Sequence, residues 1–195
     1  MKVKKQLQTL YKLATASLIS EAEFDNFSSD LMLKSPISIK KFSYLEDILR
    51  ESNLNSYIEL DPKKEQFTIH SHTLLQNIKK QWYIGNSKIF SNILDPGLID
   101  IQTIVICINL FGTRKSENIT IPTSIVKDQI KGVSFCIEQH LKVPIIPSSN
   151  SIKITNLPLF IGSILKEVPT IHSTELINFL TDKEKKKIAE GAFSK

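Results

Sequence analysis

The sequence predicts an α/β (α+β) protein of two consecutive half-domains, each ordered helix, two strands, helix, two strands, helix (αββαββα). Three observations support this. Amphipathic or apolar helices are predicted at 6–20 and again at 98–111. Each is followed by strand-like and helix-like segments in the same order. The late strands of the halves lie 85 residues apart, and the preceding helices match at an offset of 88, which indicates an internal duplication.

The helix at 6–20 is predicted from apolar or small residues at three-to-four spacing. These are Leu7, Leu10, Leu13, Ala14, Ser17 and Leu18. Part of the helix is unusually small, with Ala14, Ala16, Ser17 and Ser20 close together. Small side chains let a second helix approach closely, so we expect this helix to pack against another.

The other elements of the first half follow from alternating strand patterns, turn residues and helical spacing. They are strands at 21–27 and 30–37, a helix at 39–52, a hairpin with strands at 56–60 and 65–71, and a helix at 73–83.

The second half begins after a break at Asp95, Pro96 and Gly97, and its first helix is closed by Gly112. A strand at 118–124, a helix at 125–141, a hairpin from 142–147 and 150–156, and a helix at 159–168 complete it. We therefore expect three parts: 1–92, 93–170 and a basic helical tail at 171–195 that contains the lysine-rich run 183–187.

The composition favours an anionic partner without identifying one, since the net charge is +5 and the pI is about 9.1. Of 25 cationic residues, only Arg50 and Arg114 are arginines, and Ile, Asn and Ser are abundant. Lysine, isoleucine and asparagine have AT-rich codons. We therefore expect an AT-rich genome, and an organelle matrix such as the mitochondrial matrix, or otherwise the cytoplasm, as the location.

From the sequence we do not expect a membrane protein, a protein with a targeting segment, or a disulfide-rich protein. The longest apolar run, 104–108, is far shorter than the roughly 20 residues of a membrane span. The N-terminus lacks arginine before Arg50 and an uninterrupted apolar core, so we expect neither a signal peptide nor a mitochondrial presequence. Cys107 and Cys136 lie in apolar segments and indicate no disulfide framework.

The repeated order of elements resembles the single-chain LAGLIDADG homing endonucleases, in which two half-domains pack about a pseudo-two-fold axis. Local segments add to the resemblance over about residues 7–170. They are SPISIKKFSYLEDILRESNL, EQFTIHSHTLLQNIKKQWYIGNSKIF with its junction at Trp82, Tyr83 and Lys88, LDPGLIDIQTIVICINLFG, and ENITIPTS.

In this family each signature helix carries an acid near its C-terminal end, and these acids hold divalent metal at the scissile phosphates. The resemblance places Glu21 at the first acid position, before Ala22, and Phe111 at the second, before Gly112. Phenylalanine cannot coordinate a metal. We therefore expect no catalytic or metal site, with Glu21 as the residual candidate, Glu23 as the acid if the alignment shifts by two, and Mg²⁺ only if cleavage is retained.

The family also implies that two hairpin sheets form a saddle for a nucleic acid, which needs cations for phosphates and polar groups for bases or ribose. Candidate contacts lie on predicted strands and turns. They are Lys34, Lys40, Lys41, Lys63, Lys64, Thr68, His70, Arg114, Lys115, Thr120, Lys153 and Thr155. For each lysine alone, an ordinary solvated side chain is the competing interpretation.

Other chemistry has weak support. His70 and His72 alternate in a strand-like segment, but the sequence offers no third metal ligand. No phosphate-binding loop, nucleophile elbow or catalytic-cysteine pattern occurs. The lysine-rich run is more often a solvated helix face than a docking site, although RNA or an acidic protein would suit it.

Three functions follow. The first is an inactive, pseudo-dimeric monomer that binds RNA rather than DNA, as a maturase-like factor or a component of an organellar ribonucleoprotein such as the mitochondrial ribosome. The second is an active homing endonuclease using Glu21 with another acid such as Asp100. The third is a non-cutting DNA-binding regulator. A protein-binding structural role would follow if no nucleic acid bound.

Overall fold

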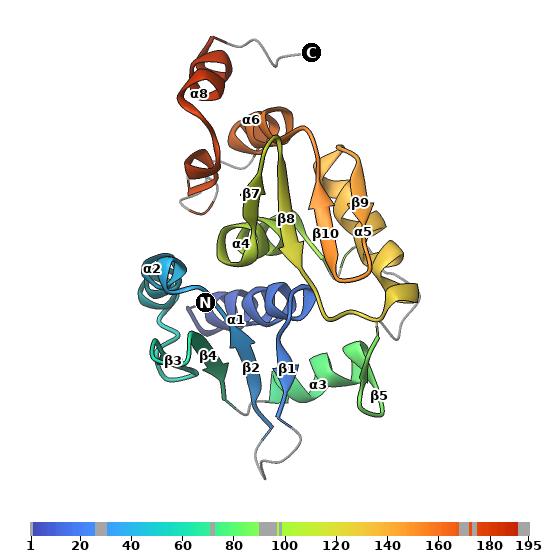
Figure 1. Ribbon diagram of the computed structural model, residues 1–195. Helices are drawn as coiled ribbons and strands as arrows, with labels where there is room; N and C mark the ends of the chain where they lie inside the picture. The colour runs from blue at the N-terminus through green and yellow to red at the C-terminus, as the bar shows by residue number, and fades with distance from the viewer. Residues whose placement is uncertain are drawn as a thin grey trace.

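The computed structural model describes residues 2–25, 31–70, 73–89, 97, 99–167, 172 and 175–190, and its two α+β halves lie one above the other in Figure 1. The first half contains α1 (Lys2–Ile19), β1 (Glu23–Phe24), β2 (Leu33–Pro36), η1 (Ile39–Lys41), α2 (Phe42–Ser52), β3 (Ile58–Asp61), β4 (Gln66–Ile69) and α3 (Thr73–Trp82). The second contains α4 (Ile101–Phe111), β7 (Thr113–Lys115), β8 (Asn118–Pro122), α5 (Lys127–Leu141), β9 (Ile145–Pro147), β10 (Ser151–Ile154) and α6 (Leu157–Glu167). The predicted α+β class and repeated order are confirmed.

Each half forms a four-stranded antiparallel sheet, and the two sheets have the same topology. The first has the order β1-β2-β4-β3 and the second β7-β8-β10-β9. In both, the inner strands come from different hairpins, so the central pairing joins residues far apart in the sequence. The shared topology supports the internal duplication more strongly than residue identity between the halves does.

The central helix pair, α1 and α4, makes the most extensive contact between helices among the described elements. As expected from its small side chains, α1 buries Ala14, Ala16 and Ser17 completely. In α4, every residue from Thr103 to Phe111 is buried, with at most 8% of its surface exposed. Small residues on one helix thus admit the bulkier residues of the other, and the core of both halves is continuous through this pair.

The ends of α4 have clear local causes. Asp100 begins the helix because its carboxylate accepts hydrogen bonds from the Thr103 amide at 2.8 Å and hydroxyl at 2.9 Å. The helix therefore starts at Ile101, whereas the sequence prediction started it at residue 98. Gly112 ends it in an extended conformation, with its amide donating to the Ile108 carbonyl oxygen at 2.8 Å.

Other details differ from the sequence prediction. Strand β7 and the short hairpin of β5 (Tyr83–Ile84) and β6 (Ser87–Lys88) were not predicted. These strands are too short to show an alternating pattern, and the pairing of each is local, across a tight turn to the next strand in the sequence. Phe135, one of the apolar residues of the predicted α5 helix, is 53% exposed.

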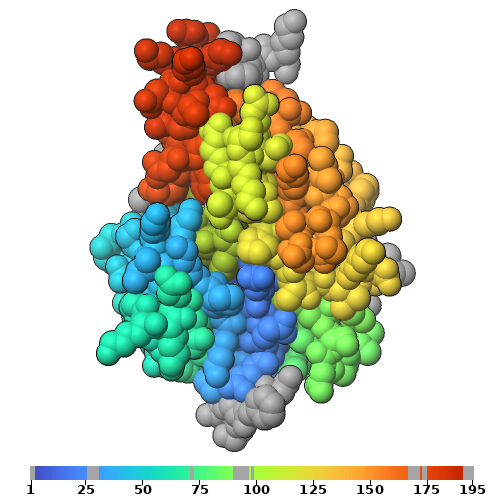
Figure 2. Space-filling view, in the orientation of Figure 1, coloured from blue at the N-terminus to red at the C-terminus, as the bar shows by residue number. Residues whose placement is uncertain are grey.

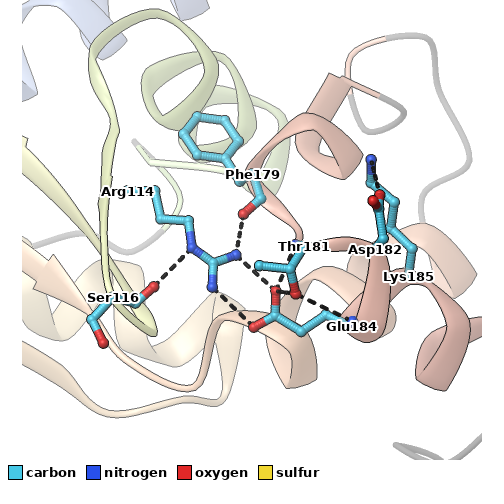
Figure 3. A network of polar contacts seen from close by, with 7 residues as sticks. All are labelled: Arg114, Ser116, Phe179, Thr181, Asp182, Glu184 and Lys185. Atoms are coloured by element: carbon cyan, nitrogen blue, oxygen red, sulfur yellow. Dashed lines mark hydrogen bonds and ion pairs between the residues drawn. The ribbon is translucent and has the colours of Figure 1, made fainter.

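The C-terminal segment packs onto the second half through Arg114, as Figure 3 shows. It contains η3 (Glu175–Phe179) and α8 (Asp182–Ala189). The Arg114 guanidinium donates to both carboxylate oxygens of Glu184, at 2.7 and 3.0 Å, and to the Phe179 carbonyl oxygen at 2.5 Å. Glu184 also completes a capping box with Thr181 at the start of α8. Part of the predicted tail is therefore an ordered element of the fold.

The same segment also contacts the first half. The Lys41 ammonium lies 4.6 Å from the centre of the Phe179 ring, and Tyr44 Oη lies 3.2 Å from His172 Nδ1. The Asn109 side-chain amide of α4 donates to the His172 carbonyl oxygen at 2.6 Å. The C-terminal segment thus bridges the two halves on one side of the central helix pair.

Some predicted features lie outside the described residues. These are the boundaries at 92–93 and 170–171, the residues Asp95 and Pro96 of the predicted break, Leu98, the turn at Ser28 and Ser29, His72, and the end of the tail at 191–195. Among the described helices, none has both the length and the apolar character required to span a membrane.

The close packing at the end of α4 gives a prediction for Gly112→Ala. A Cβ there would lie 2.4 Å from the Ile108 carbonyl oxygen and 2.9 Å from Ile119 Cγ2. We expect a loss of about 1–3 kcal/mol in the free energy of unfolding, measured in urea. The matched control is Gly162→Ala, whose Cβ would meet only Ile188 Cγ1, at 3.8 Å. Because alanine favours a helix more than glycine does, this variant should have an equal or higher free energy of unfolding. Equal effects of the two changes would contradict this packing.

The Arg114–Glu184 ion pair gives a pH-dependent prediction. Hydrogen bonding to Arg114 lowers the pKa of Glu184 from 4.5 to about 2. Glu184→Gln should therefore lower the free energy of unfolding by about 1–2 kcal/mol at pH 7. The wild type should lose this advantage as the pH falls from 4.5 toward about 2, since the unfolded chain takes up the proton first. Glu190→Gln, in an exposed position, is the control, and a pH-independent difference for Glu184→Gln would refute the assignment.

Candidate nucleic-acid interface

A cleft of about 310 Å³ lies where α1 and α4 end and where the two sheets meet. Its lining comes from both halves. The lining residues are Ser20, Glu21, Pro36, Ile37, Ser38, Lys41, Glu65, Leu110, Phe111, Gly112, Thr113 and Pro122. The cleft therefore contains both positions that the family resemblance assigns to metal-binding acids.

The strand registers establish which residues of the two halves are equivalent. Glu23 pairs with Lys34, which pairs with Thr68 on β4. Thr113 pairs with Thr120, which pairs with Lys153 on β10, 85 residues after Thr68 and thus at the offset of the two late strands. Thr113 thus corresponds to Glu23. Counting back along the chain, Phe111 corresponds to Glu21 and Gly112 to Ala22, in agreement with the alignment made from sequence.

The residues of this cleft do not fit a metal site shared by the two helix ends. Mg²⁺ takes hard oxygen ligands, and Phe111 provides none. Glu21 provides one exposed carboxylate, and the other carboxylate of the cleft, that of Glu65, comes from the turn between β3 and β4. Within the described part of the chain, no three His, Cys, Asp or Glu side chains gather at a metal-binding distance.

The two alternative acids have other roles. Asp100 caps the opposite end of α4, about 16 Å along the helix axis from Phe111, and forms a 2.8 Å ion pair with Lys12. It therefore cannot join Glu21 in one site. The Glu23 carboxylate accepts hydrogen bonds from Tyr83 Oη at 2.6 Å and Ser124 Oγ at 2.7 Å. This carboxylate serves to join the end of the first half to the second.

Lys88 is the centre of this junction and was not a predicted site residue. Its buried ammonium donates to the carbonyl oxygens of Ser20 at 2.9 Å and Ala22 at 2.8 Å and to Ser124 Oγ at 2.6 Å. Burial lowers the pKa of Lys88 to about 8, although the nearby Glu23 acts in the opposite direction. The Trp-Tyr-basic junction was the only sequence signal for it, and that signal did not reveal its burial.

On the first sheet, two of the predicted lysines are paired with acids. Lys34 lies 2.7 Å from Asp25 and Lys64 3.1 Å from Asp61. His70, a predicted polar contact, lies 3.5 Å from Glu59. Thr68 is on β4 between Lys34 and Glu59 in the cross-strand register, and it is almost fully buried. Lys63 is exposed in the turn between β3 and β4.

Lys40 and Lys41 lie on η1 rather than on a strand. Lys40 is exposed, whereas Lys41 lines the cleft and packs over Phe179. Burial lowers the pKa of Lys41, an effect that Glu175 partly opposes. The C-terminal segment thus contacts Lys41 at the cleft, although none of the segment's described residues lines the cleft itself.

On the second sheet, the predicted residues divide between the two faces. Thr120 and Lys153 are cross-strand partners on the open face, the face turned away from the core, and Lys115 follows the same alternation. Arg114 pairs with the buried Ile119 and points to the other face, where it binds Glu184. Thr155 lies beyond β10, and its hydroxyl donates to the Pro144 carbonyl oxygen at 2.8 Å.

The buried ammonium predicts a specific pH dependence. The unfolded chain keeps the Lys88 proton up to about pH 10.5, whereas the folded chain releases it from about pH 8. Wild-type stability should therefore gain a rising contribution between pH about 8 and 9.5, before tyrosines ionise. Urea unfolding of Lys88→Met should lack this contribution and show a loss of about 1–3 kcal/mol from the unpaired carbonyl groups. Exposed Lys63→Met is the control, and an unchanged pH profile in Lys88→Met would contradict the burial.

Comparisons with known proteins support the architecture. No protein-family description matches the chain, and no curated protein matches it in sequence. Among solved structures, the homing endonuclease I-WcaI bound to its DNA recognition sequence is similar over 96% of this chain and 86% of that chain, with a TM-score of 0.51 and 13% identity. The protein therefore has a homing-endonuclease-like fold of two pseudo-repeat halves.

Proposed function

We propose that this protein is a catalytically inactive, LAGLIDADG-like nucleic-acid-binding protein. The observation that carries the proposal is the pair Glu21 and Phe111, which occupy equivalent positions at the ends of α1 and α4 in one cleft. A two-sided metal clamp on a scissile phosphate needs an oxygen ligand from each side. The substitution by Phe111 removes one side while the surrounding fold is retained.

Nucleic-acid binding is supported by the fold and by charge. The solved structure that resembles this chain is an endonuclease bound to DNA. The chain itself carries a net charge of +5, and Lys115 and Lys153 lie on the open face of the second sheet. Such cations attract a phosphate backbone without requiring any cleavage.

RNA is the proposed ligand, with the protein acting as a pseudo-dimeric monomer. A maturase-like factor, or a structural component of an organellar ribonucleoprotein such as the mitochondrial ribosome, needs shape-based RNA binding and no cutting. The abundance of lysine, isoleucine and asparagine, whose codons are AT-rich, supports the organellar setting. The competing functions are an active homing endonuclease and a non-cutting DNA-binding regulator on the same scaffold.

The deciding experiment combines binding with cleavage. Purified protein is titrated at low salt against structured RNA and duplex DNA, and then incubated with Mg²⁺ and candidate intron-insertion sites. We expect RNA to bind more tightly than DNA and no cut to form. Specific double-strand cuts that disappear in Glu21→Ala would overturn the proposal in favour of an endonuclease. Tighter binding to duplex DNA without cutting would favour the regulator.

A further inference from the structure

The open faces of the two sheets differ in charge although their topologies match. Across the first sheet, one cross-strand row is formed by Glu23, Lys34, Thr68 and Glu59. Asp25 and Asp61 lie on the same face, where they pair with Lys34 and Lys64. Lys34 and Lys64 each have a carboxylate beside them, whereas Lys63, in the turn, forms no ion pair with a described residue. Two further carboxylates lie on this face: Glu59, 3.5 Å from His70, and Glu23, which lies 3.7 Å from Lys88 and accepts hydrogen bonds from Tyr83 and Ser124.

The equivalent row of the second sheet is formed by Thr113, Thr120, Lys153 and Ile146. No Asp or Glu occurs in any of the strands β7, β8, β9 and β10. The nearest acid in sequence, Glu117, is in the turn between β7 and β8. Its charge acts on Arg114, where it adds to the larger effect of Glu184 in raising the pKa of the guanidinium. The open face of the second sheet is therefore cationic and otherwise uncharged.

The two cations of this face are available for a ligand. Lys115 is exposed and Lys153 is partly exposed, and neither forms an ion pair with a described residue. Arg114, between them and the core, holds the C-terminal segment on the opposite face. In Figure 2 the surface of the second half, coloured from yellow-green to orange, lies beside the C-terminal segment rather than beneath it.

A polyanion distinguishes strongly between such faces. A duplex carries one phosphate charge per roughly 1.7 Å of its axis, so a ligand over the first sheet would bring phosphates against Glu23, Glu59 and the paired Asp61. Two like charges about 4 Å apart repel by about 1 kcal/mol even at the dielectric constant of water. Over the second sheet the same backbone would meet two lysines and the hydroxyl groups of Thr113, Thr120 and Ser151.

We infer that the nucleic acid is bound asymmetrically: the open face of the second sheet contacts the phosphate backbone through Lys115 and Lys153, and the acidic open face of the first sheet does not. This inference rests on the proposed function and adds to it the surface that binds. Ile146, 49% exposed beside Lys153, supplies an apolar contact on the edge strand β9 of that surface. The two halves thus share a fold but not a role.

The test compares three double variants that each remove two positive charges. Lys115→Gln/Lys153→Gln changes the second sheet, Lys34→Gln/Lys63→Gln changes the first, and Lys131→Gln/Lys186→Gln changes exposed positions on α5 and α8. Affinity for an RNA duplex of about 20 base pairs, and for a DNA duplex of the same sequence, is measured by fluorescence anisotropy at several salt concentrations between about 50 and 200 mM.

The second-sheet variant should bind about ten- to a hundredfold more weakly, and its slope of log affinity against log salt should fall by about two. The first-sheet variant should match the α5 and α8 control, because neither pair of lysines contacts the ligand in this account. All three variants lose the same net charge, so a difference between them reports the position of the charge. Circular dichroism spectra check that each variant is folded.

The other outcomes are distinct. An equal or larger loss in the first-sheet variant would overturn the asymmetric inference while leaving nucleic-acid binding in place. A wild-type protein that binds neither duplex at low salt would overturn the proposed function and this inference together. A preference for DNA, with the loss still confined to the second-sheet variant, would retain the binding surface and correct the ligand.

Discussion

The contact between α1 and α4 is the constraint on which the rest of the structure depends. The small residues of α1, including Ala14 and Ala16, are fully buried and let the more bulky α4 pack against it. Because each helix also packs against other elements of its own half, this contact fixes the position of one sheet relative to the other. Gly112 lets the chain leave α4 directly into β7, which brings Phe111 opposite the region of Glu21.

Around this helix pair, polar groups hold the halves together at two separate places. Lys88 joins the end of α1 to Ser124 of the second half, and it is nearly fully buried because backbone carbonyl oxygens replace the water around its ammonium. On another side, Phe179 and His172 of the C-terminal segment reach Lys41 and Tyr44 of the first half. These contacts hold the two halves together without any metal bound between the helix ends.

The sequence was sufficient to predict most of the fold but only part of the candidate interface. Helical spacing at 6–20 and the strand offsets depend on local patterns, which a sequence displays directly. The sheet face to which Arg114 points could not be predicted from the sequence, because the three-residue strand β7 is too short to show an alternation that assigns its faces. The burial of Lys88 depends on residues far away in the sequence, and the pairing of Lys34 with Asp25 depends on how two strands align. Sequence position alone therefore left these two residues looking like ordinary lysines.

The central claim is that a homing-endonuclease-like frame without a paired metal site serves as an RNA-binding surface. Ultraviolet crosslinking of the full chain in its native extract, followed by sequencing of the attached nucleic acid and mass spectrometry of the attached peptides, tests this most directly. The account predicts RNA joined to peptides from the second sheet, around Lys115 and Lys153. Recovery of DNA alone, or of no nucleic acid above a background without irradiation, would contradict it.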